Sequence, residues 1–373
     1  MEKKTLRLAA VGDIMLADLT HYLGIGIGSK LRANSGFDVF EFVGDILRES
    51  DLAIGNLEAP LSKTTIHQGF AALEMRGEPE WADFLAAAGF SVLSVANNHT
   101  FQHGMDAWEN TVRALRERSI RVIGIKGEQP IVVECKGIEI ALLEYSLRPR
   151  QYLRQEESPN AIATLEDLES IEAEVRKASA LGEIVVVSLH WGKDYTRRPS
   201  VRQVQFAHSL IDAGATVIIG HHPHVLQGVE FGSNFAIAYS LGNFVFDMCQ
   251  KRARQSAILC ADVGKNSVRS ELVPVYIDTD GRPHPVDGEQ SESLLRTIDQ
   301  LNSMIPSTEI PIETDEVSFS MEVERSLKEF RRKSMAWFVR SWYRYPPRCL
   351  KYILLRGVKK HLARIARMGR TAT

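Results

Sequence analysis

The chain has 373 residues, of which 44% are hydrophobic and 25% charged, the composition of a folded globular protein. Its mean hydropathy is −0.14, and no run of about 18 apolar residues occurs, so the sequence excludes a membrane-spanning helix. The net charge of −2 is unevenly distributed. Residues 325–373 hold 15 lysines and arginines against one acid, a charge of +14, so residues 1–324 must carry −16. We therefore expect the C-terminal segment to have a role of its own.

The cysteines and the N-terminus both bear on the cellular compartment. The four cysteines are widely spaced and form no Cys-x-x-Cys pair, which favours reduced thiols. The first residues lead directly into a predicted strand and leave no room for a signal peptide. We expect a cytoplasmic protein.

Short β-branched runs alternate with amphipathic helices through the first two thirds of the chain. Five such runs predict buried strands over residues 7–11, 52–54, 92–95, 184–189 and 217–219. Helices are predicted over residues 38–49, 80–88, 106–118, 164–181 and 201–213. A further strand is predicted over 121–125, and a Lys-Gly pair predicts a hairpin between 131–135 and 138–145.

From residue 228 onward the pattern changes to strands without helices. These strands are predicted over 228–231, 235–240, 256–263 and 267–277. Alternating strands and helices followed by a strand-rich part predict two mixed sheets packed together, with helices outside. We divide the chain into a domain over 1–278, a turn-rich linker over 279–317 with a helix at 291–304, and a helical tail over 318–373.

Polar residues stand where each of the five strands ends. Ligands bind beyond the carboxyl ends of strands in α/β sheets, so we expect these side chains to meet at one sheet edge. They are Asp13, Asn56, Glu58, Asn98, His99, His190, His222 and His224. Such oxygen and imidazole donors constitute a divalent-metal site. Pro223 supplies the bend that would turn both His222 and His224 inward.

Six motifs in chain order carry a family resemblance. They are Gly-Asp at 12–13, Gly-Asn-Leu-Glu at 55–58, Asn-Asn-His at 97–99, His-Trp-Gly at 190–192, His-Pro-His at 222–224 and Ser-Leu-Gly-Asn-Phe at 240–244. Over roughly residues 6–277 the chain resembles the bacterial capsule and poly-γ-glutamate synthesis (CapA-type) family, a branch of the calcineurin-like metallophosphoesterases. The resemblance implies an α/β fold, a four-layer α/β/β/α sandwich of two mixed sheets, with two divalent ions (Mn, Fe or Zn) at the strand ends.

The resemblance also implies roles for individual residues. Metal ligands would be Asp13, Asn56, Glu58, Asn98, His190, His222 and His224. His99 would be the catalytic proton donor, and Arg76, Asn97 and Asn243 would bind substrate. A salt bridge at a helix start is the alternative role for Arg76, and a turn contact for Asn243.

Two positions depart from the phosphoesterase pattern. Met15 stands where a phosphoesterase has a histidine, a change shared by the CapA-type branch, and one metal site thereby loses an imidazole. Gln102 stands where the family usually has an aspartate, and an amide cannot accept a proton from His99. The second departure bears on acid–base chemistry more than on metal binding.

The predicted function is a metal-dependent, phosphoesterase-like hydrolase acting in capsule, poly-γ-glutamate or exopolymer biosynthesis. Its substrate would be an anionic polymer or a phosphoester. The alternative is a non-catalytic accessory protein whose metal pocket binds an anionic polymer or a lipid-linked intermediate. The departures at Met15 and Gln102 favour this alternative.

The tail combines basic residues with apolar ones. One helical face is predicted to hold Leu350, Leu354, Val358, Leu362 and Ile365, and an aromatic cluster precedes it. Basic amphipathic helices with interfacial aromatics bind anionic membrane surfaces, here the inner face of the membrane. Docking on the acidic body of the same chain is the second interpretation. Nucleic acid is not expected as a partner, because no nucleic-acid-binding motif accompanies the charge.

Overall fold

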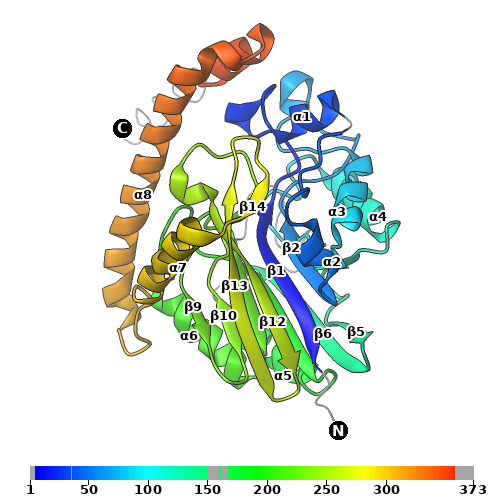
Figure 1. Ribbon diagram of the computed structural model, residues 1–373, viewed down its shortest axis with the longest axis vertical. Coiled ribbons are helices and arrows are strands. Elements are labelled where there is room, and N and C mark those ends of the chain that lie inside the picture. The colour runs from blue at the N-terminus through cyan, green and yellow to red at the C-terminus, as the bar shows by residue number, and fades with distance from the viewer. Residues whose placement is uncertain (1–4, 35, 149–158, 161–166, 358–373) are drawn as a thin grey trace, which may run out of the picture.

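The computed structural model describes residues 5–34, 36–148, 159–160 and 167–357. Two mixed β-sheets lie face to face, with helices on both outer sides (Figure 1). This is the predicted four-layer α/β/β/α sandwich.

The first sheet has eight strands in the order β14-β13-β12-β1-β2-β3-β4, with β11 beside the end of β1. The strands are β1 (Leu6–Ile14), β2 (Leu52–Leu57), β3 (Val92–Ser94), β4 (Arg121–Ile123), β11 (Asn243–Val245), β12 (Gln255–Gly264), β13 (Ser267–Ile277) and β14 (Pro283–Pro285). β1 runs parallel to β2 and β11 and antiparallel to β12. β1 and β2 are buried on both faces, which explains their nearly continuous hydrophobic sequences.

The second sheet has six strands in the order β5-β6-β7-β8-β10-β9. They are β5 (Ile131–Cys135), β6 (Ile138–Ser146), β7 (Ile184–His190), β8 (Val217–His221), β9 (Val229–Phe231) and β10 (Ala236–Ala238). β5 and β6 form the predicted hairpin, while β6, β7 and β8 are parallel. Every predicted strand is thus present, with some ends shifted.

The main core lies between the sheets. Alternate residues such as Leu8 and Ile54 on the first sheet pack with Leu142, Val186 and Ile219 on the second, all of them buried. The outer face of the first sheet is covered by α1 (Ile27–Ala33), α2 (Gly44–Arg48), α3 (Ala82–Ala88) and α4 (Met105–Arg116). The outer face of the second sheet is covered by α5 (Leu168–Ala178) and α6 (Val201–Asp212).

Two predicted helices differ from the observed ones. The helix expected over 38–49 exists only as α2, because residues before Gly44 form turns. The Asp38 carboxylate accepts a hydrogen bond from the backbone of Phe40 (2.8 Å), a local contact that competes with helix formation. The helix expected from Thr164 is observed from Leu168, and Thr164 itself lies outside the described residues.

The segment predicted as a linker contains structure that packs on the body. β14 extends the first sheet, and the helix predicted at 291–304 is observed as α7 (Gly288–Asn302). Leu294, Ile298 and Leu301 of α7 are buried in the cluster between the sheets. Much of this segment therefore belongs to the folded body.

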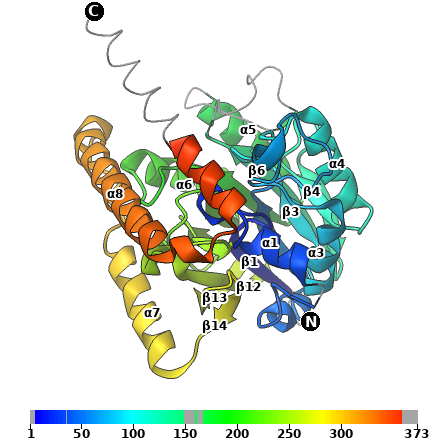
Figure 2. The same cartoon turned by 90° about the horizontal axis from the view of Figure 1, so that it is seen from above.

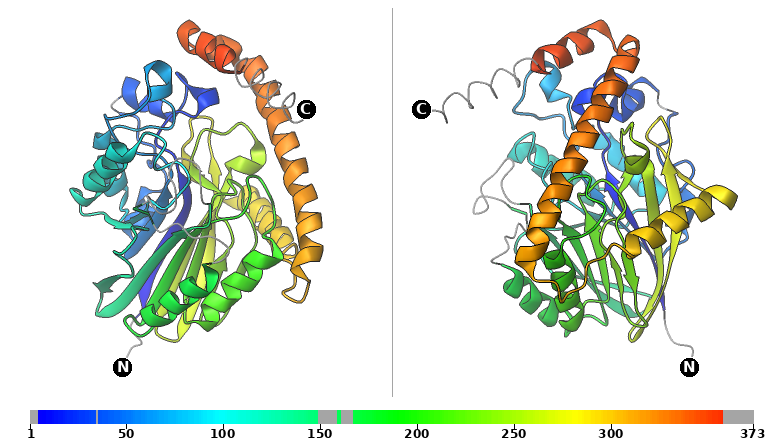
Figure 3. Two further views of the ribbon diagram at one scale, coloured as in Figure 1. Left: turned by 180° about the vertical axis from the view of Figure 1, so that it is seen from behind. Right: turned by 90° about the vertical axis from the view of Figure 1, so that its left-hand side faces the viewer.

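The long helix α8 (Ile312–Ser341) lies along one side of the molecule (Figures 1 and 3). Near its start, Asp315 and Glu322 form ion pairs with Arg198 at 2.8 and 3.1 Å. Further on, the ring of Phe330 stacks on Tyr195 with centroids 3.6 Å apart. Docking on the body is therefore observed. In this part of α8, however, the acids belong to the helix and the arginine to the body, whereas the sequence predicted basic residues of the tail on an acidic body.

The chain then turns and crosses over the body, as Figure 2 shows, with residues 347–357 helical. Cys349 and Ile353 pack against Leu23 in a buried cluster, whereas Leu354 is 51% exposed. The prediction that Leu354 belongs to the apolar face is therefore wrong. The buried face of this helix holds Cys349 and Ile353 instead. Val358, Leu362 and Ile365 lie outside the described residues. Within the described part of the chain, no helix is long and apolar enough to cross a membrane.

Candidate metal centre

The predicted metal-binding residues meet where the strands of both sheets end. Asp13 on β1 is in register with Asn56 on β2 and with Asn243 on β11. On the other sheet, His190 ends β7 beside His221, which ends β8. Parallel strands bring these positions, distant in sequence, to one edge.

Asp13 lies at the centre of this group and is fully buried. Its Oδ1 accepts a hydrogen bond from Asn56 Nδ2 at 2.8 Å and lies 3.2 Å from His221 Nδ1. Its Oδ2 accepts from the backbone of His222 at 3.1 Å and lies 3.3 Å from His224 Nδ1. Asp13 therefore joins the first sheet to the loop after β8.

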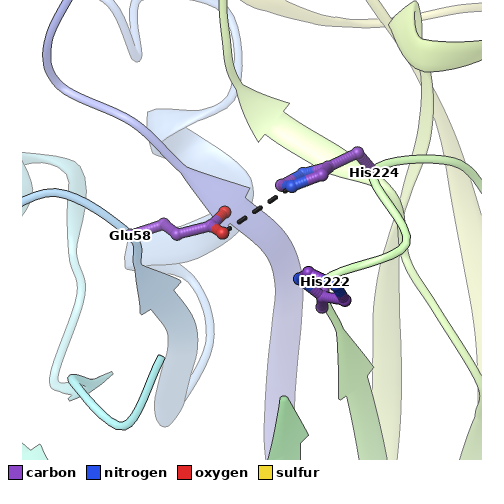
Figure 4. A group of neighbouring side chains, drawn as sticks. All are labelled: Glu58, His222 and His224. Carbon is purple, nitrogen blue, oxygen red and sulfur yellow. Dashed lines mark ion pairs between the residues drawn. The ribbon is translucent and has the colours of Figure 1, made fainter. Parts of the chain in front are cut away.

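Glu58, His222 and His224 form a cluster of possible ligands, shown in Figure 4. One donor atom from each lies within 4.8 Å of the others, and His224 Nε2 is 3.7 Å from Glu58 Oε1. Both carboxylate oxygens of Glu58 and both ring nitrogens of His222 are buried and have no hydrogen-bond partner among the described residues. Unpaired buried polar atoms are costly, and a divalent cation would satisfy them. The residues present thus fit a metal.

The loop after β8 has an unusual backbone. His222 and His224 have φ angles of 96° and 58°, in the left-handed region that non-glycine residues rarely adopt. Such strain is typical of functional sites. The bend predicted from Pro223 is therefore made by the histidines on either side of it.

Charge in the centre is balanced internally. Burial raises the pKa of Glu58 well above its usual range. Burial also opposes ionisation of Asp13, but the hydrogen bonds from His221 and His224 outweigh it and hold the pKa of Asp13 well below its usual range. At His224, burial is outweighed by Glu58 and Asp13, which raise its pKa to about 10. A proton on His224 thus balances the carboxylate of Asp13, and metal binding would displace it.

His190 and Asn98 form the other part of the centre. His190 Nε2 lies 2.7 Å from Asn98 Oδ1 and 3.8 Å from Glu58 Oε1. Burial lowers the pKa of His190 well below its usual range, so its ring is neutral, as a metal ligand must be. Its Nδ1 is 3.4 Å from Asn56 Nδ2.

His99 lies at the mouth of this group, with Nε2 4.0 Å from Glu58 Oε1. Its Nδ1 is 3.0 Å from Gln102 Oε1, an atom that can only accept, so Nδ1 carries the proton and Nε2 faces the centre. Burial lowers the pKa of His99 to about 4. Gln102 therefore orients His99 without supplying charge.

Met15 has a packing role. Its side chain is fully buried in an apolar cluster with Ala59, Val225 and Phe246. The position that holds a histidine in phosphoesterases is here part of the core.

The three predicted substrate-binding residues all have contacts within the protein. Arg76 donates hydrogen bonds to the backbone carbonyls of Ala72 and Ser62. Asn97 Nδ2 donates to Asn56 Oδ1 at 3.0 Å, and Asn243 Oδ1 lies 3.0 Å from His224 Nδ1. These contacts hold the loops of the centre in place, and substrate binding by the three residues stays a prediction.

Sequence reasoning missed two residues at the centre. His221 contacts Asp13, and the alternation of β8 could have revealed it, because Val217 and Ile219 also face the inter-sheet core. Asp194 Oδ2 lies 3.7 Å from His222 Nε2. It stands in a loop without periodicity, where the sequence carries no comparable signal.

A cavity of about 310 Å³ opens beside the centre. His99, Asp194 and His224 line its inner end, and Phe330, Ser334 and Trp337 of α8 form one wall. Trp337 stacks on Tyr22 with centroids 4.5 Å apart. The tail helix is thus part of the site.

The sequence model of the family described as "Bacterial capsule synthesis protein PGA_cap" matches residues 7–248. The chain belongs to this family. All the predicted ligands lie within the matched residues, whereas α8 lies beyond them.

Relatives in the family and solved structures give further context. The "PGA biosynthesis protein CapA" of Bacillus subtilis is 30% identical over 79% of this chain and 77% of its own length. The "Capsule biosynthesis protein CapA" of Bacillus anthracis is 31% identical over 76% of this chain and 70% of its own. A putative 5'-nucleotidase structure from Staphylococcus aureus is 14% identical, with a TM-score of 0.43 over 80% of this chain and 58% of that one.

Proposed function

We propose that this chain is a metal-dependent hydrolase of phosphoester-type substrates that acts in the synthesis of capsule, poly-γ-glutamate or a related exopolymer. The observation that carries the proposal is the set of buried donor atoms of Glu58 and His222, which lie beside His224 and have no hydrogen-bond partner in the described part of the chain. The names of the Bacillus relatives support a role in capsule or poly-γ-glutamate synthesis.

Asp13, Asn56, Glu58, Asn98, His190, His222 and His224 would hold the metal. Divalent cations supply positive charge that polarises a phosphoryl group. Asn243 fixes His224, and Asn56 fixes Asp13, so the donors keep one geometry through the reaction.

His99 would transfer the proton at Nε2. Its ring is neutral in the free protein, since burial lowers its pKa to about 4. An anionic substrate next to Nε2 would favour the protonated form, and the ring could then donate to the leaving group. Gln102 keeps Nε2 directed at the centre throughout.

Hydrolysis is tested with purified protein and Mn²⁺ on a panel of aryl phosphate monoesters and diesters. We expect turnover that His99→Ala lowers about 10²–10⁴-fold while bound metal is unchanged. His67→Ala is the matched control. His67 is a nearby histidine whose ring contacts the backbone carbonyl of Gln102, whereas His99 is oriented by the side-chain oxygen of Gln102. Bound metal without turnover on any of these esters would refute the proposal.

The alternative is a non-catalytic accessory protein that binds an anionic polymer or lipid-linked intermediate. The packing of Met15 in the core favours it, because that position offers no imidazole to a second cation. Under this alternative the metal-loaded protein binds anionic polymer without turning it over.

We also propose that the chain works at the inner face of the membrane. The end of α8 and the short 3-10 helix after it (Trp342–Arg344) expose Val339, Trp342 and Tyr343, at 62%, 59% and 72%, together with Arg340 and Arg344. Apolar and basic side chains presented together suit an anionic lipid surface. The four cysteines are all free thiols, which suits the cytoplasmic side.

A further inference from the structure

A second cavity shares a loop with the cavity at the metal centre, since Lys193 lines the second cavity and Asp194 lines the first. It has a volume of about 360 Å³ and opens where the parallel strands β6 and β7 end. Arg148 and Leu147 follow β6, and Trp191 and Lys193 follow β7. Crevices at the carboxyl ends of parallel strands are where α/β proteins bind ligands. α8 forms its outer wall through residues such as Phe319.

Some of the charged side chains around this cavity already form close ion pairs, and others do not. Its two acids are already engaged, since Asp315 pairs with Arg198 at 2.8 Å and Glu316 with Arg202 at 3.2 Å. Arg202 is therefore neutralised as well. Two cations remain, Arg148 and Lys193.

Arg148 has only one distant ionic contact among the described residues, with Nη2 3.9 Å from Asp194 Oδ2, and its buried Nε atom has no hydrogen-bond partner. Lys193 forms no ion pair within the described part of the chain and stands at the cavity mouth. Burial, and then repulsion from Arg148, lower the pKa of Lys193. Asp194 is an acid near both cations, but it also contacts His222, so two cations that share one acid with the metal centre indicate a place for an anion from outside.

This place is close to the metal centre. Asp194 contacts both Arg148 and His222, and the charge of Arg148 contributes to lowering the pKa of His222. The backbone of Leu147 donates to the carbonyl of His190 at 2.9 Å, so the arginine loop is anchored to a predicted ligand strand. A substrate whose reacting group lies at the metal could place a second group in this cavity.

We propose that Arg148 and Lys193 form a second anion subsite, which binds a carboxylate or phosphate group of the substrate next to the group held at the metal. This deepens the proposed function by naming a substrate class, an ester that carries a further anionic group, and it rests on that function only for its hydrolytic readout. Lys193 and the fork of Arg148 would bind the anion directly, while Gln203 and Ser200 in the same cavity offer additional polar contacts.

The test is equilibrium binding of two probes, a tetraglutamate peptide and tripolyphosphate, by calorimetry on full-length protein loaded with Mn²⁺. We expect Arg148→Gln/Lys193→Gln to weaken binding of at least one probe about tenfold or more, and to reduce its salt dependence. The probe that loses more affinity identifies the group as carboxylate or phosphate. Arg202→Gln is the matched control, a cation of the same cavity that is paired with Glu316, and we expect it to change binding less than twofold.

Melting temperatures establish that the variants fold. If the double variant binds both probes as well as the unmodified protein, or if Arg202→Gln weakens binding equally, the subsite does not exist. If esters are not hydrolysed but the double variant alone loses probe binding, the hydrolase proposal fails and the subsite stands. If hydrolysis occurs, the double variant should raise KM more for an ester with a second anionic group than for a simple aryl phosphate.

Discussion

At the scale of single residues, the centre depends on buried imidazoles. Neither ring nitrogen of His222 has a hydrogen-bond partner among the described residues, and His190 is held neutral by burial. We predict that His190→Ala and His222→Ala each weaken metal binding by at least about 100-fold, because each leaves an incomplete set of donors. Elemental analysis after dialysis measures this, with His208→Ala, on the outside of α6 near Glu230, as the control. Stoichiometric metal in the double variant would contradict the assignment.

Asp247 is a buried acid away from the proposed ligands. Its Oδ2 accepts a hydrogen bond from the backbone of Ile27 at the start of α1 (2.9 Å), and burial with the nearby Asp18 raises its pKa to about 8. The folded state therefore holds a proton that the unfolded chain loses near pH 4, so this residue's contribution to stability falls as pH rises from about 4 to 8.

We predict that Asp247→Asn removes this pH dependence and melts at a higher temperature than the unmodified protein above pH 8. Thermal melts from pH 5 to 9 check this. The exposed Asp45→Asn serves as control and should leave the slope unchanged. Equal slopes in Asp247→Asn and the unmodified protein would show that Asp247 does not titrate as described.

The residues predicted for the site lie together in the structure where the sequence signal was local, and their roles as metal ligands stay a prediction. Asp13, Glu58, Asn98, His190 and the two loop histidines each follow a hydrophobic strand, and the sheet then brings them together. Roles that depend on contacts across the fold were not predictable in this way. Gln102 orients His99, and Asp194 approaches His222 from a loop, because of tertiary geometry that no single stretch encodes.

At the scale of elements, strands were predicted better than helices. Strand positions follow from β-branched runs, whereas a helix start depends on competing turns such as that of Asp38. The tail shows a second limit. Its charge and aromatic content suggested a surface role, but which side of α8 packs on the body is fixed by partners such as Arg198 and Tyr195, far away in sequence.

The exposed basic residues between 340 and 348 and the side of α8 that packs on the body can be tested separately. We predict that Arg340→Glu/Arg344→Glu/Arg348→Glu abolishes binding to anionic vesicles, because each basic residue contributes about 1 kcal/mol near such a surface, about 100-fold in total. The melting temperature should not fall, since these side chains are exposed. Phe330→Ala, on the inner side, should lower the melting temperature and leave vesicle binding intact. Vesicle sedimentation at two salt concentrations decides, and equal binding by all variants would exclude the membrane role.

At the scale of the whole molecule, the centre joins the two sheets. Asp13 and Glu58 come from the first sheet, His190 and His224 from the second sheet and its loop. A cation bound between them should therefore stabilise the entire sandwich. We predict that Mn²⁺ at about 100 times its dissociation constant adds about 2.7 kcal/mol to the free energy of unfolding. Calorimetric melts measure this, and the gain should vanish in His190→Ala/His222→Ala. If Mn²⁺ bound but left the melting temperature unchanged, the prediction that the cation stabilises the whole sandwich would be contradicted.

The position of β1 in its sheet bears on how the protein is made. β1 leaves the ribosome long before one of its neighbours, β12, with which it pairs Ala10 opposite Leu259. At usual translation speeds of 5–20 residues per second, the edge of β1 waits roughly 12–50 s for that partner. An unpaired hydrophobic edge is a site of aggregation during that time. Asp13, carried by this strand, therefore reaches its final place only after β12 has been translated, which makes assembly of the centre a late event in the synthesis of the chain.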